Sequence, residues 1–483
     1  ADWNLIWNGE VKKTIRARHL WDLICTSAWE SAEPGMVFMD RYNKLSNTWY
    51  YENIRCVNPC VTGDTLIYTD QGLVTAKELA EQAAPVTVVS PNIAVRELAL
   101  AGAVSSSSKI KQQMTHTDHS VALRQASHVF ETGIKQVYKL QTVEGYTVRL
   151  TGDHRVLTTQ GWKQAAELVI GDKIHLLNGK GEFGNTGSKD LGMVLGWLVG
   201  DGYINTKRTG SIALCFFGSE QVIAPHFAEA CNRLVAKIGR QNREYTVGVQ
   251  SIKEREESRV ESTRLISLVD AELFENKLQV PTSVLHGSCD MQKSFLAALF
   301  TADGSIQGIL EKGFSVRLTS ISQNLLEGVQ RLLLNFGIAS HIYKNRRVAG
   351  IRELPNSQRK LASYNCQAYH DLVISKQNIQ VFAREIGFMT DEKQGKLLKS
   401  LGELSRGPYR EDFLATFENL MPDGEEMVYD LSEPEMHHFV GNGFILHNCG
   451  EQGLPPYGVC NLGALNLSAF VQNGQLDYEQ LAE

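Results

Sequence analysis

The stretch ILHNCGEQG (445–453) places an asparagine, whose side-chain amide can cyclise, directly before a cysteine. A second cysteine ends the stretch RCVNPC (55–60), after an Asn-Pro pair that has no evident continuation. When residues 60–448 are removed on paper, the flanking residues read NPCGEQ and only one of the two border cysteines remains. The two half-motifs therefore predict that the ends of the chain belong together and that residues 60–448 are an insertion.

Length and composition predict several ordinary folded domains. The 483 residues are enough for about three domains, and 43% apolar with 21% charged residues is typical of globular proteins. The net charge of −6 disfavours a chain that is basic throughout but allows a local basic groove. The nine scattered cysteines disfavour a secreted disulfide framework. Because the sequence also lacks a signal peptide and a run of about 20 apolar residues, we expect a cytoplasmic protein with no membrane partner.

The texture of the sequence changes along the chain in the order A, B, C, B, A. Residues 14–35, TIRARHLWDLICTSAWESAEPG, show helical spacing of apolar residues, whereas the sequence from Cys60 alternates as strands do. Long helical patterns and short strands follow, and strand texture returns before Cys449. The order predicts nested insertions, with domains at residues 1–59, 60–185, 186–402, 403–448 and 449–483.

The residues at the two borders carry the chemistry that a self-removing segment needs. Cys60 can attack the carbonyl of Pro59 and convert that peptide bond into a thioester, because a thiolate is a strong nucleophile. Cys449 can then accept the acyl chain from Cys60. Asn448 can cyclise to a succinimide and cut its own C-terminal bond, with His447 as general acid or base. None of these steps requires a cofactor.

This pattern resembles the inteins, which splice themselves out of precursor proteins. The stretch CVTGDTLIYTDQG (60–72) is similar to their N-terminal motif, and TGDHRVLT (151–158) is similar to their Thr-x-x-His motif. The resemblance implies that Thr151 and His154 polarise the Pro59–Cys60 peptide bond. A Thr-x-x-His sequence alone is usually only a turn, so the prediction depends on the joint occurrence of the motifs.

The C-terminal part of the insertion carries the remaining intein motifs. The stretch VYDLSEPEMHHFVGNGFILHN (428–448) is similar to them, and the resemblance implies that Asp430 and His437 assist acyl transfer and asparagine cyclisation. Asp430 alone is also compatible with a surface turn, and His438 is the neighbour with which His437 can be confused. The implied fold is an all-β, horseshoe-like Hint splicing domain built from residues 60–185 and 403–448.

The joined sequence NPCGEQ resembles the active-site segment of ribonucleotide reductases, most of all the adenosylcobalamin-dependent class. The resemblance implies that Cys449 becomes the radical cysteine of the ligated product. Asn58 matches the substrate-binding asparagine, Glu451 matches the general base, and Cys460 matches one of two reducing cysteines. Residues 1–59 and 449–483 are accordingly expected to be short α/β extein pieces of a reductase that takes adenosylcobalamin and a ribonucleotide.

Two similar stretches in the middle of the chain predict a pair of closely packed helices. In LGMVLGWLVGDGYI (191–204) and SFLAALFTADGSI (294–306), small residues recur every fourth position before an aspartate. Residues four apart share one helical face, so the two backbones can approach closely. The packing would bring Asp201 and Asp303 together, where a divalent cation such as Mg²⁺ relieves their repulsion and can assist phosphodiester hydrolysis. The alternative is a pair of helix ends with no metal.

These two stretches resemble the two motifs of a LAGLIDADG homing endonuclease in a single chain. The family implies an α+β domain over residues 186–402 that binds double-stranded DNA, with Lys277 and Lys393 as active-site lysines. The basic stretch YKNRRVAGIRELPNSQRK (343–360) fits contact with phosphates, and is equally compatible with a solvated hairpin. The expected target is the reductase gene without the insertion.

The sequence therefore predicts a multidomain precursor that excises residues 60–448, ligates its exteins and carries a DNA endonuclease. Two alternatives are a reductase with a regulatory insertion that is never excised, and a free-standing endonuclease or a domain that cleaves without ligating. The Asn448–Cys449 pair disfavours a free-standing endonuclease or a domain that cleaves without ligating. The interruption of the reductase motif by Cys60 disfavours a regulatory insertion that is never excised.

Overall fold

The computed structural model describes residues 2–7, 10–31, 60–92, 121–207, 210–238, 245–252, 256–309, 313–355, 361–403, 409–448, 471–472 and 475–476. The chain divides into two compact units, Pro59–Asn448 and the flanking residues Ala1–Asn58 with Cys449–Glu483. Among the described residues, none of the helices has both the length and the apolar character needed to cross a membrane.

The flanking unit contains a hairpin followed by a helix. β1 (Asp2–Trp7) pairs antiparallel with β2 (Glu10–Arg16), and α1 (Ala17–Ser31) follows directly. The helix expected from residue 14 therefore begins three residues later, because Thr14 to Arg16 pair with β1 instead. The short strands β26 (Val471–Gln472) and β27 (Gln475–Leu476) also pair with each other.

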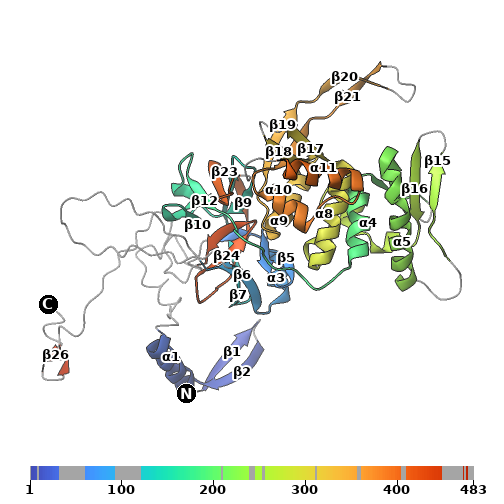
Figure 1. Cartoon of the computed structure of the whole chain (residues 1–483). Coiled ribbons are helices and arrows are strands. Elements are labelled where there is room, and N and C mark those ends of the chain that lie inside the picture. Colours follow the sequence, from blue (N-terminus) through green and yellow to red (C-terminus); the bar gives the residue numbers. More distant parts are fainter. Residues whose placement is uncertain are drawn as a thin grey trace, which may run out of the picture. The chain divides into compact units, whose positions relative to one another are not determined.

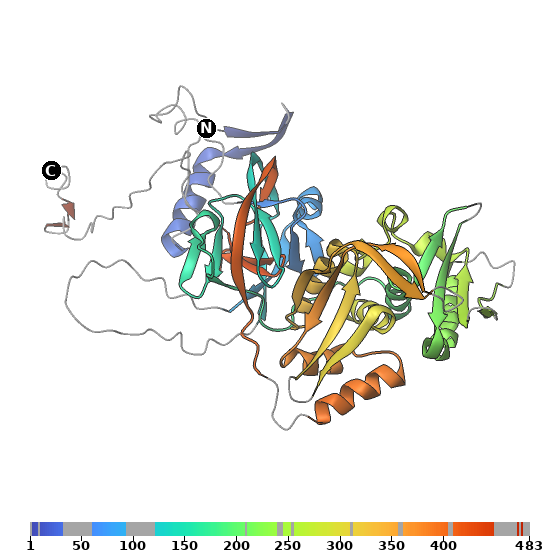
Figure 2. The same cartoon turned by 90° about the horizontal axis from the view of Figure 1, so that it is seen from above.

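The first part of the inserted unit is a sheet of 13 strands among the described residues, with strands from both sides of the helical middle region. The long strands β8 (Phe130–Thr142) and β23 (Leu414–Asp430) lie side by side, although about 270 residues separate them in the sequence (Figure 2). The strands that were expected from the alternating pattern are therefore present. The other strands of this sheet are β3 (Val61–Thr62), β4 (Leu66–Thr69), β5 (Gly72–Thr75), β6 (Val86–Pro91), β7 (Val121–Ala126), β9 (Thr147–Leu150), β10 (Arg155–Thr158), β11 (Gly161–Gln164), β12 (Lys173–His175), β24 (His438–Gly441) and β25 (Phe444–His447).

In the described part of this region, one helix and one 3-10 turn accompany the sheet. α3 (Ala76–Gln82) begins with a capping box, in which the Thr75 side chain accepts from the backbone of Glu78 and the Glu78 side chain accepts from the backbone of Thr75. The 3-10 turn η1 (Ala165–Glu167) follows β11. The strands bury side chains such as Leu140, Val148 and Val156, so the sheet encloses its own apolar core.

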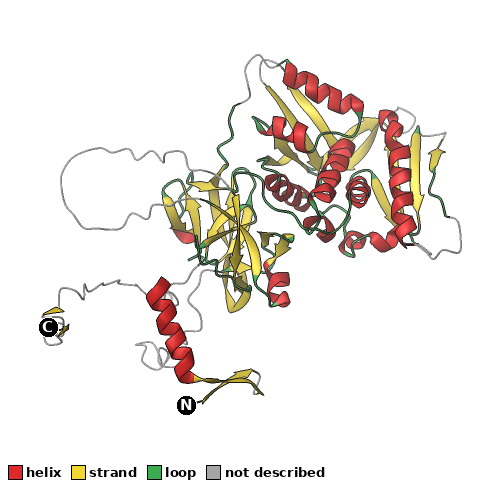
Figure 3. Cartoon of the chain, turned by 60° about the horizontal axis from the view of Figure 1, so that its bottom comes forward, coloured by secondary structure: helices red, strands yellow, loops and turns green. Residues whose placement is uncertain are grey.

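The middle region is α+β, with helices that lie against two four-stranded sheets (Figures 1 and 3). One sheet has the order β13-β14-β16-β15 and the other has the order β17-β18-β22-β19, and a two-stranded ribbon, β20 with β21, extends from this region. The strands are β13 (Gly202–Asn205), β14 (Ser211–Phe217), β15 (Val249–Ile252), β16 (Glu257–Ser262), β17 (Gly304–Ile309), β18 (Gly313–Ser320), β19 (His341–Arg347), β20 (Gly350–Pro355), β21 (Leu361–Cys366) and β22 (Tyr369–Ile374). The helices are α4 (Lys189–Val199), η2 (Gly218–Ile223), α5 (Ala224–Ile238), η3 (Leu265–Leu268), α6 (Glu272–Glu275), α7 (Thr282–Leu285), α8 (Cys289–Asp303), α9 (Gln323–Asn335), α10 (Asn378–Glu385) and α11 (Asp391–Gly402).

The close packing of α4 against α8 confirms the prediction from the small-residue stripes. A Cβ on Gly192 would lie 2.1 Å from the Met291 carbonyl oxygen, and a Cβ on Gly196 would lie 2.2 Å from that of Phe295. No real side chain fits at these distances, so glycine is required for this helix separation. Each helix also has a serine N-cap, Ser188 for α4 and Ser288 for α8.

Candidate functional site

Thr151 makes two hydrogen bonds with the backbone of Cys60 at the start of the insertion. The backbone N–H of Cys60 donates to Thr151 Oγ1 at 3.0 Å, and the backbone N–H of Thr151 donates to the Cys60 carbonyl at 3.0 Å. The nitrogen held in this way belongs to the peptide bond that the border chemistry would break. Thr151 follows β9, and β9 pairs with β3 at Val61, so the sheet positions the contact.

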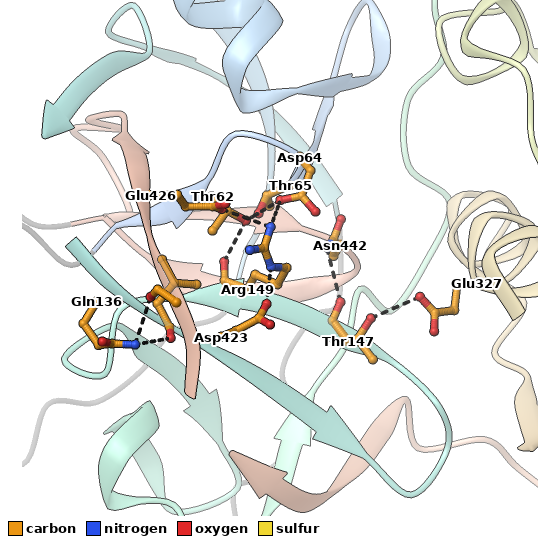
Figure 4. A network of polar contacts seen from close by, with 12 residues as sticks. Thr62, Asp64, Thr65, Gln136, Thr147, Arg149, Glu327, Asp423, Glu426 and Asn442 are labelled. Atoms are coloured by element: carbon orange, nitrogen blue, oxygen red, sulfur yellow. Dashed lines mark hydrogen bonds and ion pairs between the residues drawn. The ribbon is translucent and has the colours of Figure 1, made fainter. Parts of the chain in front are cut away.

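Strand β9, which ends directly before Thr151, is held by ion pairs around Arg149 (Figure 4). The guanidinium of Arg149 lies 2.6 Å from Asp423, 3.0 Å from Glu426 and 3.2 Å from Asp64. Each ion pair at the surface contributes little alone, but together they join β9 to β23 and to the loop after β3. These ion pairs thereby help to hold Thr151, at the end of β9, close to Cys60, at the start of β3.

The sulfur of Cys60 is buried and has two polar neighbours. Thr132 Oγ1 lies 2.9 Å from Cys60 Sγ, and Lys135 Nζ donates to Cys60 Sγ at 3.2 Å. Burial raises the pKa of the Cys60 thiol to about 12, with a smaller increase from Asp430, while Lys135 and Thr132 act in the opposite direction. The thiol is therefore protonated at neutral pH, and the two neighbours favour its ionised form.

His154 is completely buried beside this cysteine. Burial lowers the pKa of His154 to about 4, and the nearby charges of His447 and Lys135 lower it further, although Asp153 and the Cys60 backbone oppose them. Neither ring nitrogen makes a hydrogen bond of normal geometry to another described residue. A neutral imidazole near a scissile peptide can transfer a proton.

The last strand of the insertion, β25, ends at His447, directly before Asn448, and belongs to the sheet that also positions Cys60 and His154. β25 pairs with β10, the strand that begins next to His154, through Leu446 and Val156. Asn448 is 2% exposed; its backbone N–H donates to the His437 carbonyl at 3.0 Å. The side-chain amide of Asn448 therefore approaches the reaction site from a defined backbone position.

The side chain of Asn448 is held by its nitrogen. Asn448 Nδ2 donates to the Glu433 carbonyl at 3.1 Å, while Asn448 Oδ1 has no hydrogen-bond partner among the described residues. The buried carboxylate of Glu433 accepts from the backbone N–H groups of Glu435 and Met436 and so orders this loop. The nitrogen that would attack during cyclisation is thus oriented by a loop carbonyl.

The histidines at the end of the insertion have different surroundings. His437 is exposed, with a φ of 56°, and it contacts Asn448 through its backbone carbonyl. His438 is buried, with Nε2 2.8 Å from the Pro91 carbonyl and Nδ1 2.9 Å from the Met436 carbonyl. His447 lies opposite His438 in the hairpin and packs edge-on against Trp162. The role of the His437 side chain stays a prediction.

Asp430 lies at the end of β23 and is 1% exposed. Its Oδ1 accepts from the backbone N–H of Leu431 at 2.8 Å, and its charge raises the pKa of Cys60. The strands that carry or adjoin the predicted splicing residues thus belong to one sheet. These residues are Cys60, Thr151, His154, Asp430, His447 and Asn448.

A second group of charged residues lies where α4 and α8 end. Gly200 directly precedes Asp201 in the sequence, and a Cβ on Gly200 would lie 3.5 Å from Asp303 Oδ2. Asp303 therefore lies close to the backbone that carries Asp201. Partial burial and the Asp201 charge raise the pKa of Asp303 to about 6, although this side chain keeps contact with solvent, and burial also raises the pKa of Asp201. The two carboxyls therefore disfavour each other's charge.

Lys277 and Lys393, which the resemblance implied as active-site lysines, both lie near this pair of carboxyls. Lys277 Nζ donates to the carbonyls of Gly200 at 2.7 Å and Gly202 at 2.6 Å, at the end of α4. Lys393 Nζ donates to the Thr301 carbonyl near the end of α8 and pairs with Glu220 at 3.1 Å. Cations at helix C-termini are favourable. The charges of both lysines lower the pKa values of Asp201 and Asp303.

The paired carboxyls fit a hard divalent cation. Mg²⁺ is commonly bound through one or two carboxylates and completes its shell with water or phosphate oxygens. No cluster of three or more His, Cys, Asp or Glu in the described part of the chain could hold a metal ion by itself. An ion at Asp201 and Asp303 would therefore depend on water or substrate for its other ligands.

Sequence reasoning missed some residues of both sites. Thr132 and Lys135 beside Cys60 gave no motif, and only their strand pairing reveals them. Glu220 lies in the 3-10 turn η2 and is distant in sequence from its partner Lys393. The predicted residues Asn58, Cys449, Glu451 and Cys460 lie outside the described residues.

Parts of the chain are similar to known proteins. A family model described as a LAGLIDADG-like domain matches residues 290–387. A crystal structure of a mutant of the Ssp DnaB mini-intein is 12% identical, with 81% of this chain and 99% of that chain covered and a TM-score of 0.26. A structure of the homing endonuclease I-DmoI is 20% identical, with 41% of this chain and 88% of that chain covered and a TM-score of 0.28. The family match places a LAGLIDADG-like domain within the insertion, whose two borders carry the motifs that resemble those of inteins.

The chain is also similar to a ribonucleotide reductase subunit over most of its length. Over 467 residues the chain is 27% identical to the Ribonucleoside-diphosphate reductase NrdEB subunit alpha of Bacillus subtilis (strain 168). The match covers 92% of this chain and 41% of that protein, so the chain spans about two fifths of the length of this relative.

Proposed function

We propose that the chain is a precursor that splices itself, with residues 60–448 excised and residues 1–59 ligated to residues 449–483. The observation that carries the proposal is the double hydrogen bond between Thr151 and the Cys60 backbone, beside the buried His154. These groups surround the peptide nitrogen that must leave. The proposed Hint domain comprises residues 60–185 and 403–448, interrupted by an endonuclease domain at 186–402.

The first step of the proposed reaction is the acyl shift at Cys60. The Cys60 sulfur attacks the carbonyl carbon of Pro59, a C–S bond forms, and the C–N bond to the Cys60 nitrogen breaks. The departing nitrogen takes up a proton, for which His154 is the nearby carrier. Thr151 holds that nitrogen in a fixed position by accepting its hydrogen bond at 3.0 Å.

The remaining steps use the C-terminal border. Cys449 takes the acyl chain from Cys60, and Asn448 Nδ2 then attacks its own backbone carbonyl and releases the insertion. His447, Asp430 and His437 assist these steps. The final shift of the acyl chain from sulfur to nitrogen at Cys449 leaves an ordinary peptide bond.

Mass spectrometry of the expressed chain tests the proposal. We expect two products: a ligated chain that contains NPCGEQ, and a free segment of residues 60–448. Cys60→Ala should block cleavage at the N-terminal border, whereas Asn448→Ala should block release at the C-terminal border only. Persistence of the unmodified full-length chain under reducing conditions would contradict splicing and favour an insertion that is never excised.

We propose a second activity, site-specific cleavage of double-stranded DNA, because Asp201 and Asp303 approach each other between two lysines. Asp201 and Asp303 would hold Mg²⁺, which supplies activated water and stabilises the leaving oxygen when bound. The proposed target is the reductase gene without the insertion, and the basic ribbon β19 to β21 would contact its phosphates. Asp201→Asn should abolish Mg²⁺-dependent cutting of that gene, and unchanged cutting would contradict the assignment.

The host activity proposed for the ligated product is reduction of a ribonucleotide with adenosylcobalamin. Its support is the joined NPCGEQ motif, with Asn58, Cys449, Glu451 and Cys460 in the roles that the resemblance implies. Because Cys60 interrupts this motif, the precursor should be inactive until it splices. We propose that splicing takes place in the reducing cytoplasm, because the first splicing step needs Cys60 as a free thiol. An assay of the ligated protein with and without adenosylcobalamin tests this step.

A further inference from the structure

We propose that Lys135 is a further catalytic residue of the first splicing step, where its ammonium group stabilises the Cys60 thiolate and aims it at the scissile carbonyl. The inference rests on the proposed splicing function. It is carried by a direct contact, because Lys135 Nζ donates to Cys60 Sγ at 3.2 Å.

The position of Lys135 in the sheet is defined by its neighbours on both sides. Lys135 lies on β8 opposite Glu426 of β23. Val137, two residues along the same strand, points to the same side and packs with Cys60 and Val428 in a small buried cluster. The ordinary alternation of the strand therefore directs Lys135 towards the sulfur.

A β-bulge adds the second polar neighbour of the sulfur. In the pairing of β8 with β23, Glu131 faces Tyr429 and Gly133 faces Val428, so Thr132 is the extra residue. Gly133 has a φ of 107°, which a side chain would resist. In a regular strand, residues 132 and 135 would face opposite sides, but the bulge allows both to reach Cys60.

Among the described residues, the charged groups with the largest effect on Cys60 come from the strands around it. Asp430 of β23 raises the pKa of the thiol, and burial raises it more. Lys135 is the main opposing charge, while the Thr132 hydroxyl assists it. His154, from the loop before β10, is neutral at pH 7 because burial lowers its pKa to about 4. Among the described residues, Lys135 thus contributes the positive charge that most offsets the cost of ionising this buried thiol.

The proposed step balances without a further reactant. Cys60 Sγ loses its proton and bonds to the Pro59 carbonyl carbon, and the bond from that carbon to the Cys60 nitrogen breaks. The proton that leaves sulfur reaches the departing nitrogen, so no net proton is consumed. Lys135 keeps its own protons and contributes charge and a hydrogen bond.

The test measures thioester formation alone, in the full chain with Cys449→Ala and Asn448→Ala. Hydroxylamine cleaves thioesters, so release of residues 1–59 as the hydroxamate reports the first step. We expect Lys135→Met to slow this release at pH 7 by about 10- to 100-fold, the range for a lost charge-assisted hydrogen bond. The rise of the rate with pH should also move to higher pH, because the thiol loses its cation.

Two variants and the parent chain separate the possible outcomes. Lys135→Arg should restore most of the rate, and Lys139→Met, about 13 Å further along the same strand, should match the parent. A parent-like rate and pH profile in Lys135→Met, with the parent active, would overturn the role of Lys135 and leave splicing intact. Equal loss in Lys135→Met and Lys135→Arg, with an unchanged pH profile, would also overturn it as a structural effect. If the parent releases no hydroxamate, the proposed splicing function fails, and this inference fails with it.

Discussion

The substitution Gly196→Ala tests whether the packing of α4 against α8 depends on the absence of a side chain. The new Cβ would lie 2.2 Å from the Phe295 carbonyl oxygen and 3.0 Å from Ala298 Cβ. A carbon–oxygen contact needs about 3.3 Å, so the helices would have to separate by roughly 1 Å. The obstacle is helix backbone and cannot rotate away.

The expected net effect on stability is a loss of about 2 kcal/mol. Overpacking of this kind costs up to about 3 kcal/mol, while alanine in place of glycine within a helix returns about 1 kcal/mol. A loss of about 2 kcal/mol corresponds to a roughly 30-fold decrease in amide protection. The separation would also move Asp201 away from Asp303, so DNA cleavage should fall together with stability.

Hydrogen-exchange mass spectrometry of peptides from α4 and α8 measures this effect locally. The chain should carry Cys60→Ala and Asn448→Ala, so that a single unprocessed species is compared. The matched control is Gly395→Ala in α11, where a Cβ meets no atom within 4 Å; this control should increase protection. Equal or higher protection of α4 in Gly196→Ala would refute the argument that close backbone approach requires glycine.

Three other perturbations have expected outcomes from the described contacts. Thr151→Val removes the acceptor of the Cys60 N–H, which should cost about 1–3 kcal/mol of stability. It should also slow the hydroxylamine-dependent release of residues 1–59, and an unchanged rate would contradict a role for this hydrogen bond in the first step. Because burial lowers the pKa of His154 to about 4, the unfolded chain binds the extra proton between pH 6.5 and 4. Stability should therefore fall as the pH falls through this window, by up to about 3 kcal/mol, and His154→Asn should remove that part of the dependence in urea unfolding. Glu220→Gln removes a charge that raises the pKa of Asp303, so the acid limb of Mg²⁺-dependent DNA cleavage should move to lower pH, and a shift to higher pH would contradict the assignment.

The parts of the fold that could be predicted from sequence depend on local periodicity. The glycines of α4 recur every fourth residue, and this spacing alone predicted a close helix pair. The strand before Thr151 alternates in sequence and forms as expected, whereas the strand before Asn448 is a short apolar run that is buried. The start of α1 was wrong by three residues, because the pairing of Thr14 to Arg16 with β1 outweighs their helical spacing.

The parts of the site that could not be predicted depend on which strands become neighbours. Lys135 contacts Cys60 because β8 pairs with β9 and β23, which both pair with β3, and Thr132 joins it because of a bulge. Such a bulge changes which side chains share a face, and Gly133 is its local sign in the sequence, although a glycine in a strand does not say which side chains the bulge brings together. The pair Lys393–Glu220 likewise joins a helix to a distant 3-10 turn.

The surroundings of Cys60 link the start of the chemistry to completion of the fold. The sulfur is enclosed by Val137 from β8 and Val428 from β23, and β3 pairs with β23 through Val61 and Tyr429. Because β23 follows the whole LAGLIDADG region in sequence, a partly synthesised chain lacks one wall of this site. Lys135 needs the same pairing of β8 with β23 to hold its place. Strand β23 therefore acts on Cys60 in two ways, because its burial of the sulfur raises the pKa of the thiol while its pairing with β8 holds Lys135, which lowers that pKa. Both effects arise only after the LAGLIDADG region has been synthesised.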